Sequence, residues 1–243
     1  MWEWLLTPMD PTRPHEVGWH LSWHARTMVL AWGVLVPTGI LIARFFKIHP
    51  KQDWPRKLDS RFWWNTHRVC QYGACLLLCV GLWLILTAPA LTAAPGPHAF
   101  LGWTIVALAT LQVTGGLLRG TKGGPTEPAP NGSLHGDHYD MTFRRLVFEY
   151  VHKGAGYLAL VLSVLTILSG LWQANGPNWM WLSLSLWWLG LLCLAIWLQR
   201  RGMAIDTYQA IWGPDPTLPG NQRTPIGFGI RRRSPPQNQP AGE

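Results

Sequence analysis

Four histidines are distinguished by their positions, because each lies within about two helical turns of the start of a different apolar segment. They are His24, His67, His98 and His152. Each segment is long enough to cross a bilayer. An ionisable side chain at membrane depth is costly and therefore indicates a functional site. Neutral imidazole is a common axial ligand of heme iron, so this pattern predicts electron transfer through bound heme.

The direction of the segments sorts these histidines into pairs. Successive membrane spans run in opposite directions, so the first and third begin in one leaflet and the second and fourth in the other. His24 can therefore meet His98, and His67 can meet His152. One such histidine alone is more often a helix-contact residue, but the matched depth and alternation of all four favour ligation. We predict two hemes, and they are b-type because the chain contains no C-x-x-C-H motif.

Five membrane spans can be drawn from the hydropathy pattern. They run from about Trp19 to Ala43, Phe62 to Thr87, His98 to Leu118, Tyr150 to Trp172, and Trp179 to Leu198. Each has about 20 or more residues, enough for a hydrocarbon core of about 30 Å. The fifth span holds no histidine. The predicted fold is all-α, with a four-helix diheme core, one peripheral helix, and a kink in the first span at Pro37 and Gly39.

The composition agrees with a single membrane domain over residues 19–200. Charged residues make up 13% of the chain, whereas soluble domains have roughly 25%. Many of the 17 tryptophans fall near span ends, where indole prefers the headgroup level. The four cysteines lie inside apolar spans, so we interpret them as small core residues. They are Cys70, Cys75, Cys79 and Cys193.

The loops 87–97 and 173–178 on one side of the predicted bundle have no charge, whereas basic residues concentrate on the opposite side. They are Arg44, Lys47, Lys51, Arg56, Lys57 and Arg61, then Arg119, Lys122, Arg144 and Arg145, then Arg200, Arg201 and Arg231–Arg233. By the positive-inside rule this side is cytoplasmic. We therefore predict a bacterial inner-membrane protein with a periplasmic tail (residues 1–18) and a cytoplasmic C-terminus. The net charge of +8 is then a topology signal, and the chain is not expected to bind nucleic acid.

Several further residues are candidates for supporting roles. His20 lies four residues before His24 and is the alternative ligand, or an interfacial contact to a propionate or substrate. Arg26, Arg68 and Lys153 lie close to ligand histidines, so they are candidates for propionate contacts, with snorkelling to headgroups as the alternative. Gly102, Gly154 and Gly156 would let a flat macrocycle or another helix approach closely.

Two regions at the predicted cytoplasmic side are less regular. The Gly- and Pro-rich loop from Gly120 to Phe143 contains His135 and His138, which either hold a metal ion or belong to a solvated turn. In the tail (residues 201–243), the segment 205–212 keeps enough apolar residues to dock beneath the helices. From residue 213 onward, Pro, Gly, Asn and Arg dominate, which predicts disorder.

The ligand segments resemble the cytochrome b561 family, and most closely its branch of ferric-chelate reductases and DOMON-associated proteins. The matching stretches are His24-Ala-Arg-Thr-Met28 with Ala31-Trp-Gly-Val-Leu-Val-Pro37, Trp64-Asn-Thr-His67-Arg68, His98-Ala-Phe-Leu-Gly102 with Gln112, and His152-Lys-Gly-Ala-Gly156-Tyr157. The resemblance covers residues 19–173 and implies a four-helix core with two b hemes, ligated first-to-third and second-to-fourth. It also implies electron transfer to or from ascorbate, quinol, superoxide or ferric species. This chain departs from that branch because it has no DOMON domain.

The sequence thus predicts a diheme cytochrome that relays electrons across a bilayer, and so a possible oxidoreductase. The expected partners are quinol or another small donor or acceptor, with a periplasmic redox protein as a further candidate. One alternative is a heme-bearing membrane anchor subunit of a larger redox complex. Another is a metal-ion transporter that uses the histidines as a permeation path.

Overall fold

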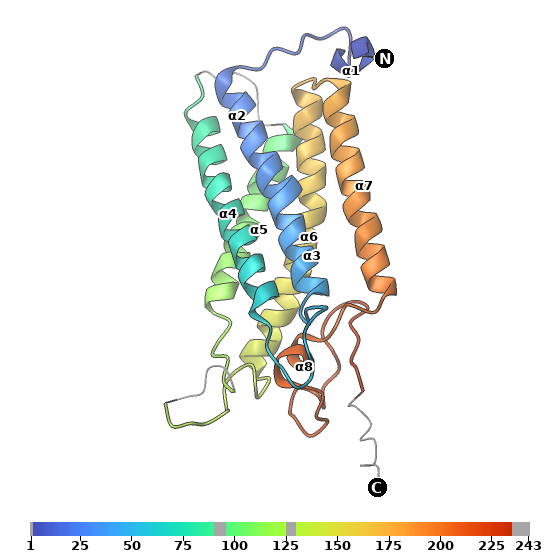
Figure 1. The fold of residues 1–243 in the computed structure, drawn as a ribbon. Helices are drawn as coiled ribbons and strands as arrows, with labels where there is room; N and C mark the ends of the chain where they lie inside the picture. Colours follow the sequence, from blue (N-terminus) through green and yellow to red (C-terminus); the bar gives the residue numbers. More distant parts are fainter. Residues whose placement is uncertain (1, 90–95, 125–129, 235–243) are drawn as a thin grey trace.

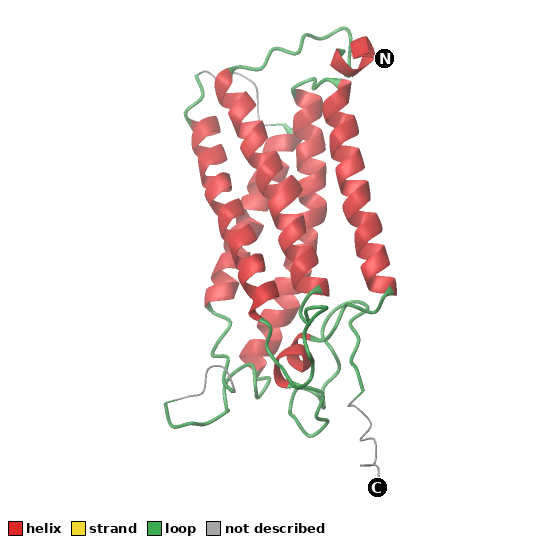
Figure 2. Ribbon diagram, in the orientation of Figure 1, coloured by secondary structure: helices red, strands yellow, loops and turns green. Residues whose placement is uncertain are grey.

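The computed structural model describes residues 2–89, 96–124 and 130–234. Its long elements are all helices that run side by side (Figures 1 and 2). In chain order the elements are α1 (Trp2–Leu6), α2 (Trp19–Met28), the π-helix η1 (Val29–Leu35), α3 (Val36–Phe45), α4 (Arg61–Leu86), α5 (Pro97–Leu117), α6 (Phe143–Gln173), α7 (Asn178–Arg200) and α8 (Thr207–Trp212).

Within the described part of the chain, five helical stretches are long and apolar enough to cross a membrane. They are Trp19–Phe45, Arg61–Leu86, Pro97–Leu117, Phe143–Gln173 and Asn178–Arg200. The prediction of an all-α protein with five spans is confirmed, and the chain is a multi-pass membrane protein. Helices α1 and α8 lie at opposite ends of the bundle (Figure 1). We call these the N end, where α1 lies, and the C end, where α8 lies.

The fourth span differs from its prediction, because α6 begins at Phe143 and not near Tyr150. The side chain of Thr142 caps this start by accepting a hydrogen bond from the backbone N–H of Arg145. The additional helical turns before Tyr150 carry Arg145 and Glu149. Charged residues lower the mean hydropathy of a sequence window, so this part of the helix was not predicted as a span. Both side chains are buried, because they face the C end of the protein and not lipid.

The core lies where four of the five stretches meet. The first span packs along α4, α5 packs along α6, and α6 also contacts η1. Small residues at these contacts let the helix backbones approach closely. The core residues are Ala31, Trp32, Val36, Ala74, Leu78, Ile105, Ala109, Ala159 and Ile167. Helix α7 lies at the edge of the bundle (Figure 1) and contributes only partly buried side chains to this core.

The first span contains the π-helix η1, which ends at Leu35, two residues before Pro37. The N–H of Val36 donates to the carbonyl five residues earlier, that of Ala31, and Pro37 has no N–H with which to continue this series. The indole N–H groups of Trp187 and Trp188 on α7 donate to the Gly33 oxygen, at 2.9 Å and 3.4 Å. The kink at Pro37 and Gly39 stays a prediction.

The C end is closed by loops and by the chain that follows α7. All six residues of α8 are buried, in agreement with the predicted docking of residues 205–212. The composition of residues 213–234 predicts disorder, but the structure gives this segment defined contacts. Arg232 donates to the carboxylate of Asp206 at 2.9 Å, and Ile226 is buried. Polar pairing with helix ends fixes this segment although it has few apolar residues. Residues 235–243 lie outside the described residues.

Candidate functional site

The four histidines form two pairs, one at each end of the bundle. At the N end, His24 of α2 faces His98 of α5, with ring centroids 6.2 Å apart. At the C end, His67 of α4 faces His152 of α6, with ring centroids 6.3 Å apart. The structure therefore brings together the same partners that the direction of the spans predicts.

The spacing of the rings fits a metal ion between them. An iron–imidazole bond is about 2 Å long, and each ring centre lies about 1 Å behind its ligating nitrogen. Two imidazoles on opposite sides of one iron therefore have centroids about 6 Å apart, which both observed separations match. The residues present thus fit a bis-imidazole heme at each end.

Backbone carbonyls orient three of the four rings. The Nδ1 atoms of His24, His67 and His98 lie 2.8 Å, 3.1 Å and 3.0 Å from the carbonyl oxygens of Gly81, Gly39 and Thr166, respectively. A carbonyl oxygen only accepts, so Nδ1 must carry the proton. In a neutral ring this leaves the Nε2 lone pair for a metal.

These carbonyl contacts also measure the separation of the two pairs. His24 contacts Gly81, fourteen residues after His67 on α4. His98 contacts Thr166, fourteen residues after His152 on α6. At about 1.5 Å per residue, both helices give a separation of about 21 Å along the bundle. The same fourteen-residue spacing thus recurs on α4 and on α6. One histidine pair lies near each end of the membrane-spanning region.

His152 is held differently from the other three. Its Nδ1 atom is buried and has no hydrogen-bond partner, and its ring stacks on Phe148 at 5.0 Å. Gln112 of α5 donates to the His152 carbonyl at 3.0 Å. A cavity of about 430 Å³ lies beside this histidine, between α5 and α6. Most of its lining is apolar, which suits the body of a macrocycle. The lining residues are Leu111, Gln112, Gly115, Leu118, Phe143, Arg144, Val147, Phe148, Val151 and His152.

The glycines near the pairs fall into two groups. A Cβ added at Gly170 of α6 would lie 2.7 Å from Cε1 of His98, so this histidine rests directly on the α6 backbone. A Cβ added at Gly102 or Gly154 would meet nothing within 4 Å, and one at Gly156 would lie 3.7 Å from Gln112. The space beside Gly102 and Gly154 is open in the structure, and a macrocycle contact there stays a prediction.

The other predicted contact residues have protein partners. His20 packs edge-on against Trp19 at 5.0 Å, whereas His24 is the residue that faces His98. The guanidinium of Arg26 lies 5.1 Å from the ring of Trp23. Arg68 lies over Trp64 and Tyr72, at 5.7 Å and 5.6 Å. A propionate contact from Arg26 or Arg68 stays a prediction.

The long loop does not unite its two histidines. His135 is 76% exposed and contacts Asp140 at 2.8 Å, whereas the side chain of His138 is 2% exposed. Across residues 2–89, 96–124 and 130–234, no group of three or more His, Cys, Asp or Glu side chains is placed to hold a metal ion. The structure thus does not support a loop metal site, because the buried and exposed positions of the two rings separate them.

A buried charged cluster at the C end was missed from the sequence. On α6, Glu149 pairs with Arg145 at 2.9 Å and with Lys153, which also donates to the carbonyl of Ile226. Lys153 is therefore bound to the C-terminal segment. Arg145, Glu149 and Lys153 are spaced four residues apart, a pattern that indicates ion pairs along one helix face. That signal was lost because the predicted span began at Tyr150.

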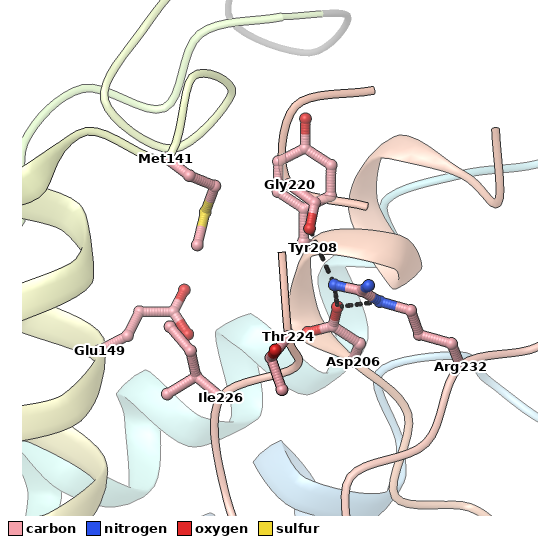
Figure 3. Close-up of a pocket in the computed structure, with 8 residues that line it drawn as sticks. All are labelled: Met141, Glu149, Asp206, Tyr208, Gly220, Thr224, Ile226 and Arg232. Atoms are coloured by element: carbon pink, nitrogen blue, oxygen red, sulfur yellow. Dashed lines mark hydrogen bonds and ion pairs between the residues drawn. The ribbon is translucent and has the colours of Figure 1, made fainter. Parts of the chain in front are cut away.

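A small cavity of about 10 Å³ adjoins this cluster, close to the volume of one water molecule. Figure 3 shows Glu149 reaching toward it from α6, while Asp206 and Arg232 pair on its other side. The remaining lining residues are Met141, Tyr208, Gly220, Thr224 and Ile226.

Lys47, in the loop after α3, is also buried here, and its ammonium donates to the carbonyl of Ile205 at 3.0 Å. Burial, reinforced by the charge of Lys153, lowers the pKa of Lys47 from 10.5 to about 7. Between these two values the unfolded chain holds a proton that the folded chain does not. Stability attributable to Lys47 therefore rises with pH across this range.

We expect Lys47→Met to stabilise the protein at pH 7, by about 1–3 kcal/mol, because it removes a buried charge. The gain should shrink toward pH 10, where the wild-type lysine is already neutral when folded. Thermal unfolding of wild type and variant in detergent at both pH values measures this. Lys51→Met, at an exposed position of the same loop, is the control, and a gain that does not depend on pH would contradict the prediction.

The fold and the paired histidines define a multi-pass helical membrane protein with a pair of facing imidazoles near each end of its bundle. No protein-family model matches the chain, and no solved structure matches it. A cytochrome b561, DM13 and DOMON domain-containing protein of Arabidopsis thaliana is 31% identical over 173 residues, which are 69% of this chain and 17% of that protein. Ferric-chelate reductase 1 of Mus musculus is 28% identical over 154 residues, 62% of this chain and 22% of the reductase. The human ferric-chelate reductase 1 is 26% identical over 152 residues, again 62% and 22%.

The chain belongs to the cytochrome b561 family. It spans only about a fifth of the length of these curated relatives.

Proposed function

We propose that this chain is a diheme b-type cytochrome that carries electrons across a membrane. The observation that carries the proposal is the geometry of the two histidine pairs, whose ring centroids lie 6.2 Å and 6.3 Å apart. The family of the chain and the names of its relatives support the same class of activity. When bound, each heme supplies an iron that accepts and releases one electron.

In this proposal the protein fixes the position and the electronic character of each iron. His24 and His98 hold one at the N end, and His67 and His152 hold one at the C end. Three of these rings are oriented by backbone carbonyls, which raise the basicity of the ligating nitrogen. The two ligand pairs lie about 21 Å apart along the bundle, so groups held there would stand near opposite faces of the membrane.

The orientation follows from the distribution of charge. The loops and tail at the C end hold most of the basic residues, so we propose that this end faces the cytoplasm and the N end the periplasm of a bacterial inner membrane. The electron donors and acceptors proposed are quinol or another small reductant on one side and an acceptor on the other, with a periplasmic redox protein as a further candidate.

Proteoliposomes with ferricyanide trapped inside test the activity. Ascorbate added outside should bleach the trapped ferricyanide when wild-type protein is present, and a quinol analogue is the second donor to try. Liposomes without protein and liposomes with His152→Ala measure leakage and should show little bleaching. A wild-type protein that binds both hemes and never reduces the trapped oxidant, with any donor, would contradict the proposal. An anchor subunit of a larger complex would then be the better description.

A further inference from the structure

His138 lies in a closed aromatic and charged environment at the C end of the bundle. Its side chain is 2% exposed, and the rings of Tyr208 and Trp212 pack edge-on against it at 5.8 Å and 6.0 Å. Its Nε2 atom is buried and has no hydrogen-bond partner. A buried polar atom without a partner costs free energy, so its presence points to a ligand or a change of state that satisfies it.

The groups around His138 determine what that ligand is. Its Nε2 atom lies 3.8 Å from Oε1 of Glu149, which itself pairs with Arg145 and Lys153. The charged groups that act on the ring are Arg145, Glu149, Lys122 and Lys153. Burial, with the charge of Arg145 second, holds the pKa of His138 well below its ordinary value of 6.5, so the ring is neutral at pH 7. An imidazole beside a carboxylate is a site for one proton.

This cluster adjoins the histidine pair of the C end. Arg145 and Glu149 lie on α6, about two turns and one turn before His152. The Arg145 guanidinium lies 5.0 Å from the ring of Phe148, and Phe148 stacks on His152 at 5.0 Å. The surroundings are buried, so a change of charge at this pair acts on His138 with little solvent screening.

We propose that His138 is a proton acceptor, which takes up one proton when the heme held by His67 and His152 is reduced. The proposal rests on the function proposed above. The heme would accept one electron from the proposed quinol or other small reductant, and one proton from solvent at the C end would bind to Nε2 of His138. No covalent bond to the heme forms or breaks. The ferric macrocycle carries one positive charge and the ferrous one carries none, so reduction favours a positive charge nearby.

The structure supplies a hydrogen-bond acceptor for the protonated ring and a small polar cavity next to that acceptor. Protonated Nε2 donates to the carboxylate of Glu149, with a small movement from 3.8 Å. Glu149 also lines the cavity of about 10 Å³, together with Asp206 and Tyr208 (Figure 3). That cavity lies between Glu149 and part of the C-terminal segment and is about large enough for one water molecule.

Redox titration of the purified, heme-loaded chain at several pH values tests the proposal. For the wild-type protein, the midpoint potential of the heme that His152→Ala removes should rise as the pH is lowered between about pH 7 and 5. The second heme, about 21 Å away, should show a much smaller dependence. His138→Gln should abolish most of the dependence, while heme content and absorption spectrum stay unchanged.

His135→Gln is the matched control, because it removes an exposed histidine of the same loop and should leave the dependence intact. Lys47→Met is the second control, since Lys47 is the other buried base near Glu149. The proposal is overturned if the midpoint potential of His138→Gln still depends on pH as strongly as that of the wild type. It is also overturned if Lys47→Met loses this pH dependence and His138→Gln keeps it. A wild-type potential that does not vary with pH, although both hemes are bound, overturns it as well.

Nuclear magnetic resonance of the wild-type chain labelled at histidine gives a measurement that does not depend on a variant. The His138 ring should titrate at a higher pH in the reduced protein than in the oxidised protein. Equal titration of His138 in the two states overturns the proposal. A chain that binds no heme overturns the proposed function as well, which separates the two failures.

Discussion

Alanine at any one of the four paired histidines is expected to reduce the heme content from two to about one per chain. Losing an axial ligand frees a coordination position, so the affected heme becomes high-spin or is lost. The pairing fixes which heme is affected. His67→Ala and His152→Ala should remove the same spectral component, and His24→Ala and His98→Ala should remove the other. Pyridine hemochrome quantitation with reduced-minus-oxidised spectra measures both effects.

His20→Ala is the control for this series, because His20 lies one turn before His24 and packs on Trp19. It should leave both spectral components in place. If His20→Ala removes the N-end component and His24→Ala does not, the ligand assignment changes and the pairing of the helices stands. If His24→Ala and His67→Ala remove the same component, the pairing itself is wrong.

Valine at Gly170 is expected to remove the N-end heme although all four histidines remain. A Cβ at this position would lie 2.7 Å from Cε1 and 2.9 Å from Nδ1 of His98, closer than real contacts allow. His98 is also held to α6 through the carbonyl of Thr166, so the ring has to leave this position to relieve the clash. Heme content should fall toward one per chain, with the spectrum of the C-end component unchanged.

Gly190→Val tests whether any glycine replacement in a membrane helix has this effect. Gly190 lies on α7, and an added Cβ would meet nothing within 4 Å. This variant should keep both hemes. A Gly170→Val protein that keeps two hemes with unaltered spectra would show that the close contact between His98 and α6 does not position the ligand.

The pairing of the histidines could be predicted because it depends on only two properties of the chain. Span direction alternates, and the distance of each histidine from its span start sets its depth. Both are visible in a sequence. The partners of the rings could not be predicted, because a contact such as that of His67 with the Gly39 carbonyl depends on how two helices are rotated against each other.

The sequence did not predict the buried charged cluster on α6 or the ordered contacts of residues 213–234. Both failures have the same physical reason. A hydropathy window assigns Glu149 a cost for leaving water, but Arg145 and Lys153 pair with it. Residues distant in the sequence complete the burial, since Lys153 contacts Ile226 and His138 contacts Tyr208. Composition alone carries no information about such long-range partners, so a segment poor in apolar residues was expected to be disordered.

The indole of Trp187 gives the histidine-free helix α7 a mechanical role. Its hydrogen bond to Gly33 is made at the joint between two halves of the first span: the half that carries His24 and the half whose Gly39 carbonyl orients His67. Rotation about this joint would turn His24 relative to His98, while Gly39 and its contact with His67 lie on the other side of the joint. The hydrogen bond from α7 opposes such a rotation, so we expect a substitution at Trp187 to affect the N-end pair more than the C-end pair.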